Sequence, residues 1–322
     1  MMKKYDVIAL GELLIDFTDN GSSAQGNTLF EANPGGAPCN VLAMLKRLGH
    51  TTAFIGKVGE DIFGLRLKKE LEKIGIDTCG LLLDKAVRTT LAFVQNDETG
   101  DRSFSFYRNP GADMMLQASE IDAELIKSAK VFHFGTLSMT HDGVREATQK
   151  ALKIARENGL MISFDPNLRE SLWDNLENAK KQAAYGLQYC DVLKISDNEI
   201  QWFTGEEDFD KGIKVLKDTY RIPLILLSMG RDGSRAYYKD ICVEVPGFLQ
   251  EGTIETTGAG DTFMGCCLHF VLEKGLEHLQ EDDLREMLTF ANGAASIITT
   301  RKGALKVMPT VEEVEALINK RV

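Results

Sequence analysis

The segment Thr256-Thr257-Gly258-Ala259-Gly260-Asp261 places two glycines and a carboxylate just before a helical pattern. Hydrophobic residues recur after it at the spacing of one helical face: Phe263, Cys266, Cys267, Phe270 and Val271. We therefore expect Gly258 and Gly260 at a helix N-terminus, with Asp261 in the first turn. A helix start carries unpaired N–H groups and a partial positive charge, and glycine lets a ligand approach that backbone closely.

A helix start of this kind predicts an anion site, most naturally for phosphate. The N–H groups of Ala259, Gly260 and Asp261 would stabilise a transferring phosphoryl group, and the Asp261 carboxylate would take a proton from an alcohol. The segment therefore predicts phosphoryl transfer to a hydroxyl group. The alternative is an ordinary helix cap, in which Asp261 satisfies backbone donors only.

A second glycine-rich string, from Asn33 to Asn40, reads Asn-Pro-Gly-Gly-Ala-Pro-Cys-Asn and precedes a helical pattern over Val41–Leu48. Gly35 and Gly36 would form a backbone floor that a polyol can approach, with Asn40 donating to a hydroxyl. The alternative is a simple turn in which Asn40 caps the helix.

The string ETTGAGDTFMGCCL, from Glu255 to Leu268, resembles the second signature of the PfkB (ribokinase-like) sugar kinases. The string 33–40 is similar to the first signature, and its Gly-Gly-Ala-Pro-x-Asn run looks specifically like fructokinases, with Cys39 where alanine is usual. Glu255 stands where an aspartate is usual. Because the neighbouring loop binds a monovalent cation in some members, the resemblance implies a K⁺ site near Glu255–Thr257.

The resemblance also implies the residues that hold the sugar. Asp16 corresponds to an acidic residue that binds sugar hydroxyls, and Arg108 lies in a string, 106–113, that is similar to the fructokinase lid. Asn167 and Arg169, in the rigid Asp-Pro-Asn-Leu-Arg loop, correspond to residues beside the substrate. The alternative for each of these is a solvated charge or an ordinary turn at the end of a strand.

A third group of residues is implied at the nucleotide. Ser196 and Glu199 match the place of the family's Asn-x-x-Glu motif, so that Glu199 would organise Mg²⁺, either directly or through a water molecule. Lys194 would contact phosphate, although a lysine that only extends to solvent at the strand end is a close alternative. The remaining implied nucleotide contacts are Ser228, Gly230, Gly233, Asn292 and Gly303.

Strand and helix patterns alternate along most of the chain, which predicts βαβ units and a mostly parallel sheet. Strands are expected at Tyr5–Leu10, Thr52–Val58, Val131–Gly135, Leu160–Asp165, Asp191–Ile195 and Pro223–Ser228, and helices at Ile62–Ile74, Val144–Glu157, Asp210–Thr219 and Leu284–Ile298. Together with this pattern, the resemblance implies a single ribokinase-like, doubly wound α/β domain over residues 1–322. A hairpin, Thr89–Gln95 with Arg102–Arg108, would join the segment around Asp16–Glu31 in a small β lid, formed by about 12–33 and 86–113. The candidate residues follow the carboxyl ends of strands, where open α/β sheets bind ligands.

Composition excludes several classes of protein. The formal net charge of -11 argues against a nucleic-acid-binding or anionic-membrane surface. The chain contains no stretch of about 18 apolar residues and is expected to be cytoplasmic. It lacks a P-loop string, and Phe263 stands where a dinucleotide fingerprint needs glycine. The five histidines show no zinc-binding spacing, so no zinc site is expected.

The predicted reaction is the ATP- and Mg²⁺-dependent phosphorylation of D-fructose at its primary hydroxyl, giving fructose 6-phosphate. A 2-keto-3-deoxygluconate kinase is the nearest alternative, and an inactive member acting as a binding or regulatory protein is an alternative of another class. Because a two-stranded hairpin cannot bury both of its faces alone, we also expect a homodimer through the lid, with Phe104 and Phe106 or their alternates at the interface.

Overall fold

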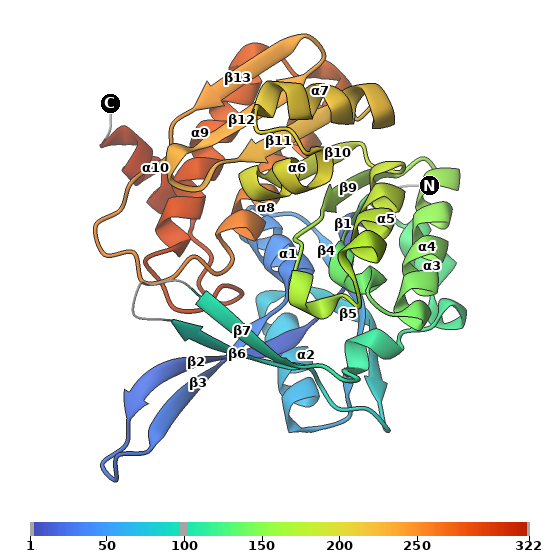
Figure 1. The fold of residues 1–322 in the computed structure, drawn as a ribbon, viewed down its shortest axis with the longest axis vertical. Coiled ribbons are helices and arrows are strands. Elements are labelled where there is room, and N and C mark those ends of the chain that lie inside the picture. The colour runs from blue at the N-terminus through green and yellow to red at the C-terminus, as the bar shows by residue number, and fades with distance from the viewer. Residues whose placement is uncertain (1–2, 97–101, 321–322) are drawn as a thin grey trace.

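The computed structural model describes residues 3–96 and 102–320 and is built around a nine-stranded sheet (Figure 1). Its strands, in spatial order, are β13 (Ile241–Val245), β12 (Ser234–Tyr238), β11 (Leu224–Ser228), β10 (Val192–Ser196), β9 (Met161–Asp165), β8 (Ala129–Gly135), β1 (Tyr5–Leu10), β4 (Thr52–Gly59) and β5 (Asp77–Asp84). All pairs from β11 to β5 are parallel, whereas the β11–β12 and β12–β13 pairs are antiparallel. The expected mostly parallel sheet is confirmed.

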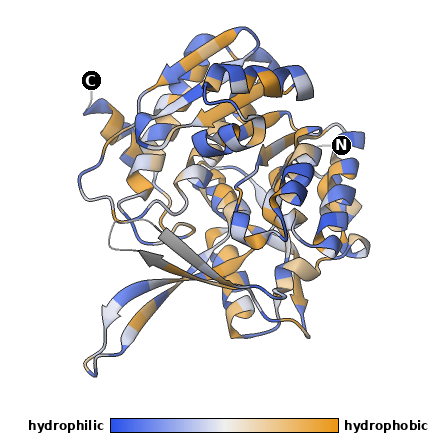
Figure 2. Ribbon diagram, viewed as in Figure 1, coloured by the Kyte–Doolittle hydropathy of each residue, from blue (hydrophilic) through white to orange (hydrophobic). Residues whose placement is uncertain are grey.

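Helices cover both faces of the sheet because its central strands are apolar on both sides. In β1, Val7 and Ala9 pack into one core, whereas Ile8 and Leu10 pack into the other. The first core contains α1 (Ala37–Arg47), α2 (Ile62–Ile74), α8 (Ala259–Lys274), α9 (Glu281–Ile298) and α10 (Val311–Asn319). The second contains α3 (Ala123–Lys127), α4 (Asp142–Glu157), α5 (Leu176–Leu187), α6 (Asp197–Thr204) and α7 (Phe209–Tyr220). The central strands are hydrophobic and the outward turns of α4 and α5 hydrophilic (Figure 2).

A separate four-stranded sheet forms the lid. Its order is β3 (Thr28–Gly35), β2 (Leu14–Ser22), β6 (Leu91–Asn96) and β7 (Arg102–Tyr107). The predicted small sheet is therefore present, and it joins the N-terminal segment to the predicted hairpin through the parallel pair β2–β6. The far end of β2 and β3 projects from the body of the protein (Figure 1). The predicted turn at 97–101 lies outside the described residues.

Some element boundaries differ from the prediction. Helix α1 begins at Ala37 rather than Val41, because Pro38 suits the first turn of a helix and Gly36 occupies the capping position. Asn40 therefore lies within the first turn and does not cap the helix. The β12–β13 hairpin was not anticipated. Among residues 3–96 and 102–320, no helix is long and apolar enough to cross a membrane.

Candidate active site

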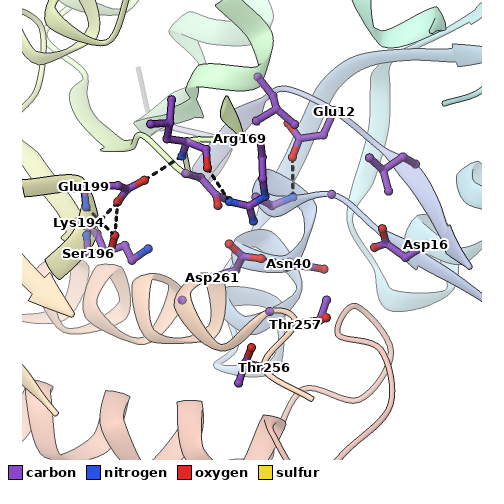
Figure 3. A pocket seen from close by; sticks show the side chains of 18 of the residues that line it. Glu12, Asp16, Asn40, Arg169, Lys194, Ser196, Glu199, Thr256, Thr257 and Asp261 are labelled. Carbon is purple, nitrogen blue, oxygen red and sulfur yellow. Dashed lines mark hydrogen bonds between the residues drawn. The ribbon is translucent and has the colours of Figure 1, made fainter. Parts of the chain in front are cut away.

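A cleft of about 510 Å³ lies between the carboxyl ends of the central strands and the lid, within the size range of small-molecule sites. Its walls come from the loop after β1, the loop after β9, the end of β10, the lid strands, and the N-termini of α1 and α8. In Figure 3, Asp261 and Asn40 lie in the middle, Lys194, Ser196 and Glu199 on one side, and Asp16 on the other. The lining residues that sequence analysis named are Asp16, Gly36, Asn40, Asn167, Arg169, Lys194, Ser196, Glu199, Gly258, Gly260 and Asp261.

The start of α8 has the predicted form. Gly258 caps the helix with a φ of 77°, a left-handed conformation that favours glycine, and Asp261 lies buried in the first turn. The predicted role of Ala259 needs a correction, because its N–H donates to the Thr256 carbonyl at 3.2 Å. The N–H groups of Gly260 and Asp261 lie in the first turn of α8, where backbone donors can bind an anion.

The Asp261 carboxylate is held in place by Asn40. The Asn40 side-chain N–H donates to Asp261 Oδ2 at 2.8 Å, which joins the first turns of α1 and α8. Burial raises the pKa of Asp261, while this hydrogen bond and the charges of Lys194 and Arg169 lower it. Burial thus makes the carboxylate a stronger proton acceptor than an exposed aspartate. Asn40 Oδ1 is buried and has no partner among the described residues, so it can accept from a ligand hydroxyl.

Lys194, the third residue of β10, carries a positive charge to the anion side of the cleft. Its ammonium lies 3.0 Å from Asp165 Oδ2, and a Cβ at Gly260 would lie 2.9 Å from Lys194 Nζ. Burial alone would lower the pKa of Lys194, but the charges of Asp165, Glu199 and Asp261 raise it. The lysine is therefore protonated beside the start of α8, where a phosphate would be bound. Its partner Asp165 was not predicted as a site residue.

Glu199 connects two loops at the same side of the cleft. One of its oxygens accepts from the Leu168 N–H at 2.8 Å, and the other accepts from the N–H and hydroxyl of Ser196 at 2.9 and 3.0 Å. Ser196 caps α6 and Glu199 closes the reciprocal capping box. Because protein donors already occupy both carboxylate oxygens, this arrangement favours contact with a metal through water.

The opposite side of the cleft is lined by Asp16 on β2 and by Gly36, with Gly35 next to it at the end of β3. A Cβ at Gly35 would overlap the Asp16 carboxylate, and a Cβ at Gly36, whose φ is 126°, would overlap the carbonyl of Glu12. Burial raises the pKa of Asp16 to about 7, and the charge of Arg169 opposes this shift. Both glycines thus let the lid approach the core closely enough to form the site.

Glu12 is a site residue that sequence analysis missed. It is buried in the cleft lining and accepts from the Ala37 N–H at 2.8 Å. Burial raises the pKa of Glu12 to about 7, although the hydrogen bond from Ala37 by itself lowers it. The signal was present in the sequence, because Glu12 lies in the same Gly-Glu-Leu-Leu-Ile-Asp string as Asp16. Trp202 on α6 and Phe106 on β7 also line the cleft.

The two predicted arginines lie in different settings. Arg169 lines the cleft, donates to the Leu168 carbonyl at 3.0 Å, and lowers the pKa of Asp16 and Asp261 by its charge. Arg108 does not line it. The Arg108 guanidinium is buried in an ion pair with Asp113 at 2.8 Å and also donates to Thr140.

The remaining expected nucleotide residues, Ser228, Gly230, Gly233, Asn292 and Gly303, do not line the cleft. Ser228 ends β11, and Gly230 and Gly233 form the turn before β12. Asn292 is buried on α9, where it accepts from Ser234 at 2.9 Å and donates to the Val245 carbonyl at 3.0 Å. In the predicted cation loop, the Gly303 N–H donates to the Glu255 carboxylate at 2.8 Å. Thr256 and Thr257 of that loop line the cleft.

Comparison with known proteins identifies the family. The sequence pattern described as pfkB family carbohydrate kinase matches residues 4–311. The chain belongs to the pfkB family of carbohydrate kinases. It is 42% identical over 306 residues to "Probable fructokinase-2" of Arabidopsis thaliana, across 94% of this chain and 93% of that relative. The predicted enzyme class, a sugar phosphotransferase, is therefore confirmed.

Solved structures of pfkB kinases share the same fold. A fructokinase from Xylella fastidiosa with bound ATP superposes with a TM-score of 0.88 at 30% identity, covering 98% of both chains. A fructokinase double mutant from Vibrio cholerae, with fructose, ADP and a potassium ion bound, superposes with a TM-score of 0.87 at 29% identity over 99% of this chain and all of that one. The ribokinase-like α/β fold with a second small sheet is confirmed.

Proposed function

We propose that this pfkB kinase phosphorylates the primary hydroxyl of D-fructose with ATP, giving ADP and fructose 6-phosphate. The observation that carries the proposal is the position of Asp261. Its buried carboxylate, held by Asn40, lies between the anion-binding start of α8 and the Asp16–Gly36 wall. A sugar hydroxyl on one side and a phosphate on the other would meet at this group. The similarity to fructokinases over nearly the whole chain supports fructose as the sugar.

In the reaction, Asp261 accepts the proton of the attacking hydroxyl as the oxygen bonds to the γ-phosphorus of ATP and the bond to ADP breaks. The N–H groups of Gly260 and Asp261 and the Lys194 ammonium stabilise the negative charge of the transferring group. Asn40, Asp16 and the Gly35–Gly36 backbone orient the sugar. Charge stabilisation and orientation are the main contributions that a protein can make to phosphoryl transfer.

Mg²⁺ is the proposed divalent partner of ATP, held near Glu199 through water. Magnesium retains several waters and needs few protein carboxylates, which suits a glutamate whose oxygens already accept from Leu168 and Ser196. K⁺ is proposed at the loop Glu255–Thr257. The support for it is the potassium ion bound to the related Vibrio cholerae enzyme and the buried carboxylate of Glu255.

The ion pair between Arg108 and Asp113 favours fructose over 2-keto-3-deoxygluconate as the substrate. The carboxylate of the latter sugar acid needs a cation in the site. Arg108 is committed to Asp113, so Arg169 is the arginine that remains in the cleft lining. Arg169 already balances the charge of Asp16 and Asp261.

The test is a kinase assay with fructose, ribose, 2-keto-3-deoxygluconate and a nucleoside, using the wild type and Asp261→Asn. Fructose should give the highest kcat/KM, with the phosphate on O6 by ³¹P and ¹³C NMR. Asp261→Asn keeps the shape but removes the proton acceptor, so kcat should fall by at least about 10²-fold, while fructose affinity changes little. The matched control is Asp218→Asn, on exposed α7, which should retain activity.

Two results would contradict these assignments separately. Preference for 2-keto-3-deoxygluconate would overturn the substrate but leave the kinase mechanism in place. Normal turnover of Asp261→Asn would overturn the base.

A homodimer through the lid is proposed as the assembly. Phe106 lines the cleft, so the face of β7 that carries it is used for the sugar and not for a partner. The opposite face of the lid is aromatic. The Phe93 ring stacks on the Phe17 ring with 4.9 Å between centroids, and its centroid lies 5.4 Å from that of Phe30 and 5.2 Å from that of Tyr107. Tyr107 is 67% exposed and Phe30 42% exposed. A second copy would cover this face.

A further inference from the structure

A histidine pair lies at the ends of α1 and α8 that are remote from the cleft. His50 follows the C-terminus of α1, and His269 is on α8. His50 Nε2 and His269 Nδ1 are 2.8 Å apart. At that distance only one of the two nitrogens carries a proton, and the other presents a lone pair. The same two helices carry Asn40 and Asp261 at their opposite ends.

A carboxylate completes the group. Glu273 lies one helical turn beyond His269, at the i,i+4 spacing that places both side chains on one face of α8. One ligand atom from each of His50, His269 and Glu273 lies within 4.8 Å of the others. Two imidazole nitrogens and a carboxylate oxygen are a common three-ligand set for zinc.

The other nitrogen of His50 also has a suitable neighbour. His50 Nδ1 lies 3.6 Å from Asp6 Oδ2, and Asp6 is itself held by the Thr51 N–H and hydroxyl at 2.8 and 2.9 Å. A carboxylate behind a histidine favours the tautomer with the proton on Nδ1. That tautomer leaves Nε2 free to bind a metal, which is the usual outer arrangement of histidine ligands.

The charges around the pair suit a cation. His50 is buried and His269 is half-buried, so a metal bound between them would be partly shielded from water. Glu273 and Asp6 contribute negative charge, and Glu286 faces His269. Lys130 is the opposing cation, and its ammonium is neutralised by Asp6 at 2.8 Å.

We propose that His50, His269 and Glu273 form a site for a Zn²⁺-class divalent transition metal, with water as the fourth ligand. Tetrahedral Zn²⁺ with bonds of about 2.0–2.1 Å separates its ligand atoms by about 3.4 Å. The two histidine nitrogens need to move apart by only about 0.6 Å from their present distance, and the exposed Glu273 can turn inward. The metal would tie the C-terminal end of α1 to α8.

Sequence spacing could not predict this site, because its two histidines are 219 residues apart. The fold brings them together by packing α1 against α8. None of His50, His269 and Glu273 lines the cleft, so the metal site can be tested independently of the proposed sugar kinase activity.

The test is calorimetric titration of the full-length protein, stripped with EDTA, with ZnSO₄ in excess Mg²⁺ and without nucleotide. We expect one Zn²⁺ per chain and a higher Tm with Zn²⁺. His269→Gln should abolish both effects, and Glu273→Gln should weaken binding at least about tenfold, as expected when one of three ligands is lost. The matched control is His278→Gln, on an exposed histidine just beyond α8, which should bind like the wild type.

Co²⁺ gives an independent readout. The wild type should show visible d–d bands typical of tetrahedral nitrogen and oxygen ligands, without the intense near-ultraviolet band of a thiolate. A thiolate band would assign the metal to the exposed Cys79 or Cys242 and overturn the proposal. Failure of the wild type to bind micromolar Zn²⁺, or wild-type binding by folded, kinase-active His269→Gln or Glu273→Gln, would overturn it equally.

Discussion

Asp261 and Glu12 are two carboxyl groups buried at the same cleft, and their hydrogen bonds give them different chemistry. Asp261 accepts from the side chain of Asn40 and lies in the first turn of α8, beside its backbone N–H groups. Glu12 accepts from the backbone of Ala37 and helps to fix the start of α1. We therefore assign proton transfer to Asp261 and a positioning role to Glu12.

At the residue scale, we predict that Glu12→Gln stabilises the protein in a pH-dependent way. Burial raises the pKa of Glu12 from 4.5 to about 7, so the folded state favours the neutral form. The contribution of protonated Glu12 to the free energy of unfolding is fully present below pH 4.5 and is lost as the pH rises through 7. Glutamine cannot ionise and can still accept from Ala37. Its gain over the wild type should be larger at pH 8 than at pH 5.5, by at most about 2 kcal/mol.

Urea unfolding at the two pH values measures this difference. Glu315→Gln, on an exposed residue of α10, is the control and should show no pH-dependent gain. Equal gains for Glu12→Gln at both pH values would show that Glu12 is ionised without cost in the folded protein.

At the scale of the element, α6 is the support for the phosphate side of the cleft. Its capping box uses Ser196 and Glu199, and the other oxygen of Glu199 accepts from the Leu168 N–H in the loop after β9. The helix start therefore couples two loops that both line the cleft. A change at Glu199 alters the position of both loops as well as the charge near the metal.

We predict that Glu199→Gln raises the Mg²⁺ concentration for half-maximal rate and lowers kcat, because one negative charge is removed and one carboxylate acceptor becomes a donor. The measurement is a Mg²⁺ titration of fructose phosphorylation at fixed ATP. Glu207→Gln, exposed in the loop after the same helix, should leave the curve unchanged. An unchanged curve for Glu199→Gln would restrict that residue to helix capping.

Elements with a regular pattern could be predicted from the sequence. The predicted strand Tyr5–Leu10 and helix Ile62–Ile74 coincide with β1 and α2, because a continuous apolar run and an amphipathic period are local signals. The start of α1 was missed, because Pro38 looks like a turn residue although it suits a first helical turn. The alternative in which Asn40 caps the helix is wrong for the same reason.

Site residues with a family motif could likewise be predicted, whereas their partners could not. The partners Asp165 and Asp113 became visible only in the structure, where they pair with Lys194 and Arg108. Each pair depends on how the chain folds around a buried charge, and a motif carries no information about that. The prediction that the Ala259 N–H binds the anion was wrong, because this N–H donates to the Thr256 carbonyl within the turn.

At the scale of the whole molecule, the lid projects from the core and exposes apolar residues on its outer face. These are Phe30 and Tyr107 of the lid, with Ile62 and Leu65 of the neighbouring α2. Phe63 of α2 contacts Phe17 of the lid at 5.8 Å, so the helix covers part of this face and a second copy would cover the rest. Several exposed apolar side chains on one face of a protein favour an interface there.

We predict a homodimer whose interface is this outer face. Light scattering at micromolar concentration should give twice the chain mass for the wild type. Tyr107→Asp with Phe30→Asp should give the monomer, because two buried carboxylates would oppose association. Val215→Asp, on exposed α7, is the control and should remain dimeric.

A monomeric wild type with full activity would contradict the dimer. A dimer that persists in the double variant would place the interface elsewhere. Of the two alternative sets of interface residues, the set with Phe106 is not proposed because Phe106 lines the cleft, and the side chain of Phe104 lies outside the described residues.

The placement of the two tryptophans gives the cleft its own optical signal. Trp202 lines the cleft beside Glu199, whereas Trp173 is buried and does not line it. Indole emission changes with local polarity and with nearby charge, so a nucleotide that displaces water from Trp202 changes one emitter and leaves the other as an internal reference. Ligand affinity can therefore be followed in the unlabelled protein by its intrinsic fluorescence, including for variants that no longer turn over.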